Sequence, residues 1–192
     1  HTAIAQDFAE DLAMMQRTYQ GIGDISATMY VHTKDAKGMP IPEMDKIVEI
    51  RKKGPLIRYE IGDTKMLYAK EHVVWVFEKA KTIMVQKRPP SSGENLMDDM
   101  GIDWDSLMNN HGNARYMGER SGLRHYVITG KEDPRLQVNL WIDMEKGFYR
   151  KMVYDYKEPF TQELFKISIE FKKWDTEPVF PAGTFAITNF VR

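Results

Sequence analysis

The sequence contains no cysteine, and its 27 basic and 28 acidic residues leave a net charge of −1. Without cysteine, disulfide bonds, thiolate zinc sites and a cysteine nucleophile are all excluded. The balance of charge argues against the basic field with which nucleic-acid-binding domains attract phosphates. No apolar run approaches the roughly 18 residues that a membrane-spanning helix needs. We therefore expect neither nucleic-acid binding nor a transmembrane segment.

Residues that commonly carry catalysis or bind metals occur here in no recognisable pattern. The five histidines include no His-Glu-x-x-His run, which is the spacing of a zinc protease. The aspartates between 98 and 105 lack the spacing of a calcium-binding loop. We therefore expect no catalytic residue, no metal site and no cofactor. A hydrolase that uses His111 or His125 with nearby aspartates is kept as a third hypothesis.

The chain does contain a succession of short apolar segments. From Ile47 to Lys87 they are rich in β-branched and aromatic residues and are separated by Gly-Pro or charged turns, a pattern typical of an antiparallel meander. The pattern resumes after residue 114, and residues 137–143 alternate cleanly between polar and apolar side chains. We predict a single domain over 1–192, whose meanders at 25–87 and 114–192 form one large sheet.

The N-terminal segment has the spacing of an amphipathic helix. Its apolar residues recur every three or four positions, at Ile4, Phe8, Leu12, Met15 and Tyr19. Residues at this spacing share one face of a helix. We predict a helix over 4–20 that docks on the sheet through this face.

A second interruption of the sheet, at 91–111, is rich in methionine. Its apolar residues fall on helical faces at Leu96 and Met100, and at Trp104, Leu107 and Met108. Long insertions between strands often act as lids or binding elements. We interpret the segment as a lid of short helices, and the alternative that it only plugs the end of the core stays open.

Four local motifs follow one another along this framework: Lys52–Glu60, Val73–Lys81, Leu140–Gly147 and Phe180–Thr184. Lys52–Glu60 reads as a strand with basic residues, a proline and an aromatic residue, and Val73–Lys81 reads as a strand with Trp and another aromatic residue before a polar turn. Leu140–Gly147 reads as a strand and turn, and Phe180–Thr184 as a shortened Phe-x-Pro-x-Gly ending. Their order, together with the helix and the lid, resembles the LolA-like superfamily of periplasmic lipoprotein carriers and outer-membrane lipoprotein-sorting proteins. The resemblance covers nearly the whole chain and depends more on this order than on any single motif.

The resemblance implies an α+β fold, in which an open, strongly curved antiparallel half-barrel is covered by the N-terminal helix and a short-helix lid. The apolar cavity of such a fold takes the acyl chains of lipoproteins. We expect its wall at Tyr59, Ile61, Leu67, Trp75, Phe77, Met84, Val138 and Leu140, and its lid at Leu96, Met100, Trp104, Leu107 and Met108. The period of two leaves open which side of each strand faces the cavity.

The carriers place an arginine immediately before their proline-containing strand, where it latches the lid. The candidates here are Lys53 and Arg58. Lysine lacks the planar fork with which arginine binds carbonyl groups, so the sequence departs from the carrier pattern at this point.

The expected function is non-catalytic binding or transport of an acyl chain or lipoprotein lipid moiety in the bacterial periplasm. Its partners would be lipid or lipoprotein acyl chains, with an envelope protein as donor or acceptor. We expect a periplasmic or outer-membrane-associated location, with the signal sequence absent from this chain. The alternative is an envelope structural or interaction protein, whose core is filled by its own side chains and whose sheet binds a protein partner.

Overall fold

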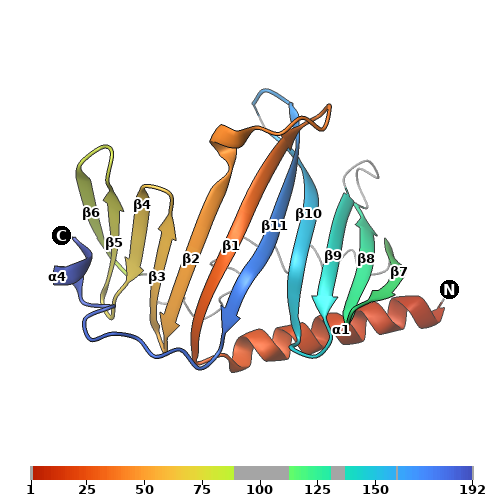
Figure 1. Cartoon of the computed structure of the whole chain (residues 1–192), viewed down its shortest axis with the longest axis horizontal. Helices are drawn as coiled ribbons and strands as arrows, with labels where there is room; N and C mark the ends of the chain where they lie inside the picture. Colours follow the sequence, from red (N-terminus) through yellow and green to blue (C-terminus); the bar gives the residue numbers. More distant parts are fainter. Residues whose placement is uncertain (1, 89–112, 131–136, 159, 192) are drawn as a thin grey trace.

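Alternation of apolar and polar side chains builds most of the molecule, because each strand can then bury one face and leave the other in water. The computed structural model describes residues 2–88, 113–130, 137–158 and 160–191, with side chains from Phe8 onward. Eleven strands form a single antiparallel sheet (Figure 1). They are β1 Asp24–Asp35, β2 Lys46–Lys53, β3 Leu56–Ile61, β4 Thr64–Tyr68, β5 His72–Phe77, β6 Thr82–Lys87, β7 Ala114–Arg120, β8 Leu123–Thr129, β9 Gln137–Asp143, β10 Phe148–Lys157 and β11 Leu164–Asp175.

The order of strands across the sheet is β6-β5-β4-β3-β2-β1-β11-β10-β9-β8-β7. The strands β1 to β6 meander outward from the centre, and β7 to β11 meander back to it, so that β1 pairs with β11. β6 and β7 are the two edges, and the sheet is therefore open. This confirms the predicted α+β half-barrel with its N-terminal helix. The lid expected at 91–111 lies outside the described residues.

The predicted N-terminal helix is present as α1, Thr2–Gly21. Phe8, Leu12 and Met15 are fully buried and Tyr19 is 3% exposed, as their common helical face predicts. The helix lies along one end of the strands (Figure 1). At the turn between β9 and β10 it passes so close to Gly147 that a Cβ there would collide with the Thr18 hydroxyl.

The core lies between α1 and one face of the sheet, which we call the inner face. Aromatic rings fill its centre: Phe148 stacks on Trp174 with ring centroids 4.2 Å apart, and Tyr19 meets Trp174 edge-on at 5.7 Å. Contacts of this kind contribute beyond the area that they bury. The aromatic residues of β10 and β11 therefore fix the position of α1 on the sheet.

A buried carboxylate also holds α1 to β8. Asp11 is 4% exposed and accepts hydrogen bonds from Arg124 Nη1 at 2.9 Å and from the Tyr126 hydroxyl at 2.6 Å. Asp11 lies in the middle of α1, too far from its N-terminus for the helix dipole to act on it, so its role is tertiary. A buried carboxylate needs such partners, because desolvation of the charge is otherwise costly.

We expect Asp11→Ala to lower the free energy of unfolding by about 2–4 kcal/mol. The substitution leaves Arg124 and Tyr126 without their acceptor, and the partial exposure of Arg124 keeps the loss below that of a fully buried pair. Urea denaturation measures it, with Glu10→Ala as the control, because Glu10 is the exposed neighbour on the same helix. Equal losses in both variants would contradict the role assigned to Asp11.

The C-terminal segment packs on the opposite, outer face of the sheet. The sequence predicts a short extended segment there, but the chain forms turns and the short helix α4, Ile187–Phe190. Phe190 is 3% exposed and packs with Leu67, Ala69 and Val74 of the β4–β5 region. Burial of this aromatic ring holds the short helix against the outer face of the sheet.

Two tyrosines at the interface between α1 and the sheet, Tyr19 of α1 and Tyr149 of β10, remain neutral at high pH. Burial raises the pKa of both Tyr19 and Tyr149 above the ordinary value of 10.0. The unfolded chain ionises these groups near pH 10, whereas the folded protein keeps their protons. Their contribution to stability is therefore complete below pH 10 and is lost as the pH rises above it.

We expect the free energy of unfolding to fall above pH 10, by about 1.4 kcal/mol per pH unit for each tyrosine that stays neutral. Urea titrations at pH 8, 10 and 11 measure this slope. Tyr149→Phe removes one of the two groups and should make the slope shallower by one such increment. An unchanged slope in this variant would show that Tyr149 does not carry the effect.

Candidate apolar binding surface

The register of the strands extends the inner face well beyond the core. Ile50, Tyr59, Met66, Trp75 and Met84 lie directly opposite one another across β2 to β6. Cross-strand neighbours in a sheet point to the same side. Ile50 belongs to the core beneath α1, so the whole row belongs to the inner face.

Exposure increases along this row with distance from α1. Tyr59 is 3% exposed, Trp75 is half-buried and Met84 is 46% exposed. The helix packs against the β7 to β10 side of the sheet, and it does not extend over β4 to β6. An apolar surface is therefore left open to solvent at the β6 end of the inner face.

Aromatic side chains dominate this open surface. The rings of Trp75 and Phe77 on β5 are stacked, 6.3 Å apart with an interplanar angle of 6°. Tyr59 and Tyr68 meet edge-on at 6.1 Å. The indole N–H of Trp75 is buried and has no hydrogen-bond acceptor among the described residues. An unmade buried hydrogen bond costs free energy, so an acceptor atom brought by a ligand would stabilise this site.

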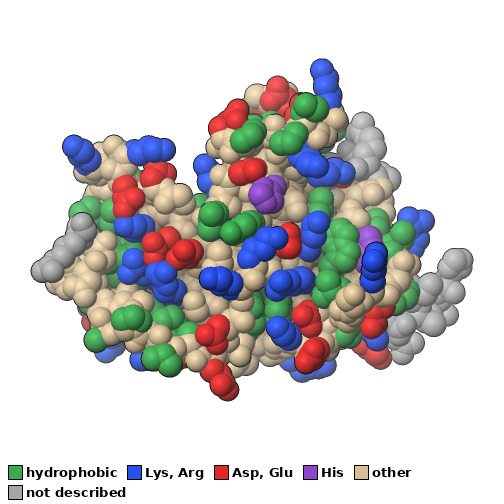
Figure 2. Space-filling view, in the orientation of Figure 1, with side chains coloured by type: hydrophobic (Ala, Val, Ile, Leu, Met, Phe, Trp, Pro, Cys, Tyr) green, Lys and Arg blue, Asp and Glu red, His purple; other side chains and the backbone are tan. Residues whose placement is uncertain are grey.

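The outer face is different in character. Figure 2 shows it as a surface on which acidic and basic side chains are interspersed. They form ion pairs within and between strands, such as Arg51 with Glu60 and Lys172 with Glu170. The two faces of the sheet thus separate an apolar inner surface from a charged outer one.

Seven of the eight predicted wall residues lie on the inner face. Ile61, Trp75, Phe77 and Met84 form the open apolar surface, and Tyr59, which is 3% exposed, lies where this surface meets the core. Val138 and Leu140 of β9 also face inward, but Leu140 is 1% exposed and Val138 packs against the core. These last two are therefore covered by the protein itself.

Leu67 was wrongly assigned to the wall. It lies opposite Arg58 and Val74 in the register, and it is fully buried on the outer face against Phe190. The alternation of β4 alone permits either side to face inward, and only the docking of the C-terminal helix decides it. The predicted lid residues Leu96, Met100, Trp104, Leu107 and Met108 lie outside the described residues.

The two latch candidates occupy different places. Lys53 is exposed at the end of β2. Arg58 lies on the outer face, where Nε donates to Glu60 at 3.0 Å and Nη1 donates to the carbonyl of Thr184 at 3.2 Å. Its guanidinium group also lies 5.2 Å from the centre of the Phe190 ring. These contacts fasten the C-terminal segment to the outer face, whereas the lid was predicted on the inner face.

Sequence reasoning missed Lys52, which is the basic residue of this region that faces inward. It is 8% exposed, and its ammonium group donates to the carbonyl of Ile22 at 2.6 Å, just after the end of α1. A cation at this end of a helix is favourable for the helix dipole. The alternation Ile50–Lys52 was the signal that could have identified it.

The candidate metal ligands and the histidines of the third hypothesis do not come together within the described residues. No group of three or more His, Asp or Glu side chains there could hold a metal ion. His125 of the third hypothesis lies on the outer face, stacked on Trp141 at 4.2 Å, and His111 lies outside the described residues. No helix in the described part of the chain is long and apolar enough to cross a membrane.

Comparison with known proteins gives matches to solved structures alone. No protein-family model matches the chain, and no curated protein matches it. A LolA superfamily protein from Nitrosomonas europaea is similar with a TM-score of 0.40 and 8% identity, over 92% of this chain and 98% of that chain. A putative outer-membrane lipoprotein-sorting domain from Vibrio parahaemolyticus has a TM-score of 0.40 and 12% identity, over 98% of this chain and 100% of its own.

The MucA/MucB complex of Pseudomonas aeruginosa gives a TM-score of 0.46 and 12% identity, over 93% of this chain but 60% of that one. The solved structures that match the chain thus include a LolA superfamily protein and an outer-membrane lipoprotein-sorting domain. At these identities the similarity concerns the fold. It assigns no role to any residue and no function to this chain.

The contacts of Arg58 predict how the C-terminal segment is held. We expect Arg58→Ala to speed amide hydrogen exchange in residues 184–191 by at least several-fold, because it removes one hydrogen bond and one cation–π contact. Hydrogen exchange followed by mass spectrometry measures this. Lys53→Ala removes an exposed charge nearby and serves as the control. Unchanged exchange in Arg58→Ala would show that the segment is held by Phe190 alone.

Proposed function

We propose that the open inner face binds an acyl chain or a similar apolar ligand without chemistry, as a carrier or sensor of lipid in the bacterial periplasm. The observation that supports this most is the continuation of the core face, beyond the buried Tyr59, into an uncovered surface of Trp75, Phe77 and Met84. A soluble protein seldom exposes a contiguous apolar surface that has no use. The absence of cysteine is compatible with an oxidising compartment.

The physical chemistry of the surface suits an acyl chain. Each methylene group removed from water contributes about 0.8 kcal/mol, so a long chain needs only a broad apolar wall. Aromatic rings and methionine side chains provide such a wall, and methionine adapts to irregular shapes.

Met84 and Ile83 provide a matched test of which face binds. They are neighbours on β6 with similar exposure, 46% and 50%, and they point to opposite faces. We expect Met84→Asp to weaken binding of a fluorescent fatty acid at least tenfold, because it places a charge against the ligand and removes its apolar contact. Ile83→Asp should leave the affinity within about twofold, since it alters only the outer face.

Fluorescence titration gives the two affinities, and native mass spectrometry of the purified protein gives the stoichiometry. Saturable binding of one ligand per chain supports the proposal. Equal effects of the two variants would argue against the inner face as the site. A protein that carries no lipid and binds none would contradict the proposal as a whole.

A second candidate function is suggested by the edge strand β6. All its side chains are exposed, including Ile83, Met84 and Val85 at 46–58%. Exposed apolar edge strands are templates on which another chain can add a strand. An envelope interaction protein that binds a partner through this edge would fit that observation. Such a protein would contain no lipid and would not respond to any lipid offered, so the titration above distinguishes the two functions.

A further inference from the structure

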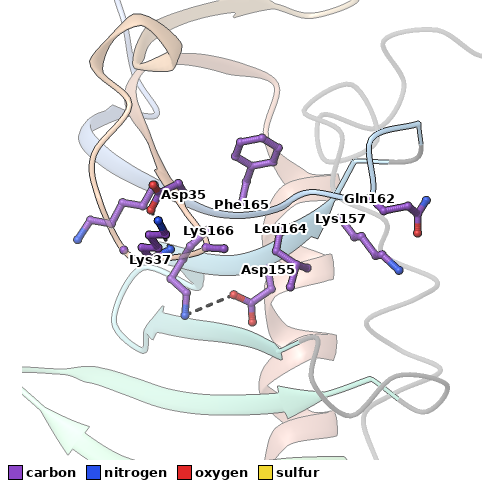
Figure 3. A pocket seen from close by; sticks show the side chains of 11 residues that line it. Asp35, Lys37, Asp155, Lys157, Gln162, Leu164, Phe165 and Lys166 are labelled. Atoms are coloured by element: carbon purple, nitrogen blue, oxygen red, sulfur yellow. Dashed lines mark hydrogen bonds and ion pairs between the residues drawn. The ribbon is translucent and has the colours of Figure 1, made fainter.

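A cavity of about 740 Å³ lies where β1 ends and β11 begins (Figure 3). Its walls are the loop that follows β1, the end of β10 and the beginning of β11. The charged residues that line it are Lys34, Lys37, Lys157, Lys166, Asp35 and Asp155. Lys34, Lys166 and Asp155 form a cross-strand row on the outer face, so the cavity is separate from the apolar surface of the inner face.

Both aspartates of this cavity are already engaged. Asp35 Oδ1 accepts hydrogen bonds from the backbone N–H groups of Lys37 and Met39, each at 2.8 Å. Asp155 pairs with the ammonium group of Lys166 at 3.3 Å and accepts a hydrogen bond from the backbone N–H of Gln137 at 3.2 Å. Figure 3 shows the contact between Lys166 and Asp155. Four lysines thus face two carboxylates, and the carboxylates are used to hold the walls together.

The sheet register places two of these lysines directly against each other. Lys34 lies opposite Lys166 in the pairing of β1 with β11. Like charges at directly opposed positions destabilise a sheet. Asp155 is the cross-strand partner of Lys166 and forms its ion pair with that lysine. Asp155 thus offsets the charge of Lys166, whereas Lys34, Lys37 and Lys157 form no ion pair with any described residue.

We propose that this cavity binds a phosphate-bearing anion. The ammonium groups of Lys34 and Lys37 would each donate to phosphate oxygens, with Lys166 adding positive charge and Lys157 lining another part of the cavity. Lysine binds phosphate as a compact point charge. The cavity lies within the roughly 300–1,000 Å³ of pockets for small organic ligands, so a phosphate ester fits better than a bare ion. The ester could be a soluble metabolite or the headgroup of a phospholipid, and the chemistry recognised is the same.

The first measurement uses stability, because a binding site and a purely structural cluster respond in opposite ways. We expect Lys34→Gln to raise the thermal unfolding midpoint of the ligand-free protein, since it removes the like-charge pair. Glycerol 3-phosphate should raise the midpoint of the natural protein and have a smaller effect on this variant. A lower midpoint for Lys34→Gln without ligand would overturn the argument from repulsion.

The second measurement is affinity, for two sources of the same phosphate chemistry. Calorimetric titration with glycerol 3-phosphate tests a soluble ester. Co-sedimentation with vesicles of phosphatidylcholine, with and without phosphatidylglycerol, tests a lipid headgroup. We expect the variant Lys34→Gln/Lys37→Gln to lose about tenfold in affinity for whichever source binds. Lys173→Gln/Lys146→Gln removes the same charge from exposed positions outside the cavity and serves as the control.

Binding of either source that the cavity variant weakens and the control variant does not supports the proposal, and the source that binds names the ligand class. Binding that both variants weaken equally would reveal a general electrostatic attraction and overturn it. Failure of the natural protein to bind either source would also overturn it. Glycerol 3-phosphate carries no acyl chain, and the vesicle assay is repeated with Met84→Asp, which leaves the cavity intact. The result is therefore independent of the test of acyl-chain binding.

Discussion

The pairing of β1 with β11 is the interaction on which the rest of the structure depends. It joins Asp24–Asp35 to Leu164–Asp175, two segments from opposite ends of the chain, and it unites two meanders that would otherwise be separate sheets. Its register aligns the apolar sides of both meanders on one inner face. A slip by one residue would turn every side chain of one half to the wrong face. Such a non-local contact also makes formation of this sheet slow compared with formation of its hairpins.

Once the two meanders share a face, a single helix decides which part of it becomes core. The stripe from Phe8 to Tyr19 and the buried Asp11 fix α1 over the strands β7 to β10 and over the centre of the sheet. A helix of 20 residues extends about 30 Å, while neighbouring strands are about 4.8 Å apart. One helix therefore cannot cover eleven strands. The remaining apolar surface at β4 to β6 follows from this mismatch, and it is the basis of the proposed ligand site.

The outer face shows how a second set of residues uses the same strands. Arg58, Leu67 and Val74 alternate with the inner-face residues Tyr59, Met66 and Trp75, and they receive the C-terminal helix through Phe190. At the other end of the sheet, the lysines of β1 and β11 lie beside the loop that follows β1. The sheet thus separates an apolar surface on one side from charged contacts on the other, which keeps the two proposed binding sites independent.

The strands, the helix over 4–20 and a single large antiparallel sheet could be predicted from the sequence, because they follow from local periodicity and turn chemistry. The open form of the sheet was implied by the resemblance to the LolA-like superfamily. Tyr59, Ile61, Trp75, Phe77 and Met84 were placed on one face correctly for the same reason. Leu67 was not, since both sides of β4 are apolar and its face is set by a segment more than 100 residues later in the sequence. The inward position of Lys52 and the bond between Asp11 and Arg124 depend equally on distant partners.

By itself, the sequence determined which residues form strands and that one face of the sheet would be apolar, because a period of two or of 3.6 is a local property of the chain. Only the tertiary structure decided which apolar residues are covered and which remain open. That depends on where α1 and the C-terminal helix dock. The tertiary structure also decided that Lys34 and Lys166 lie opposite each other, because the pairing of β1 with β11 is not encoded by any local pattern of the sequence.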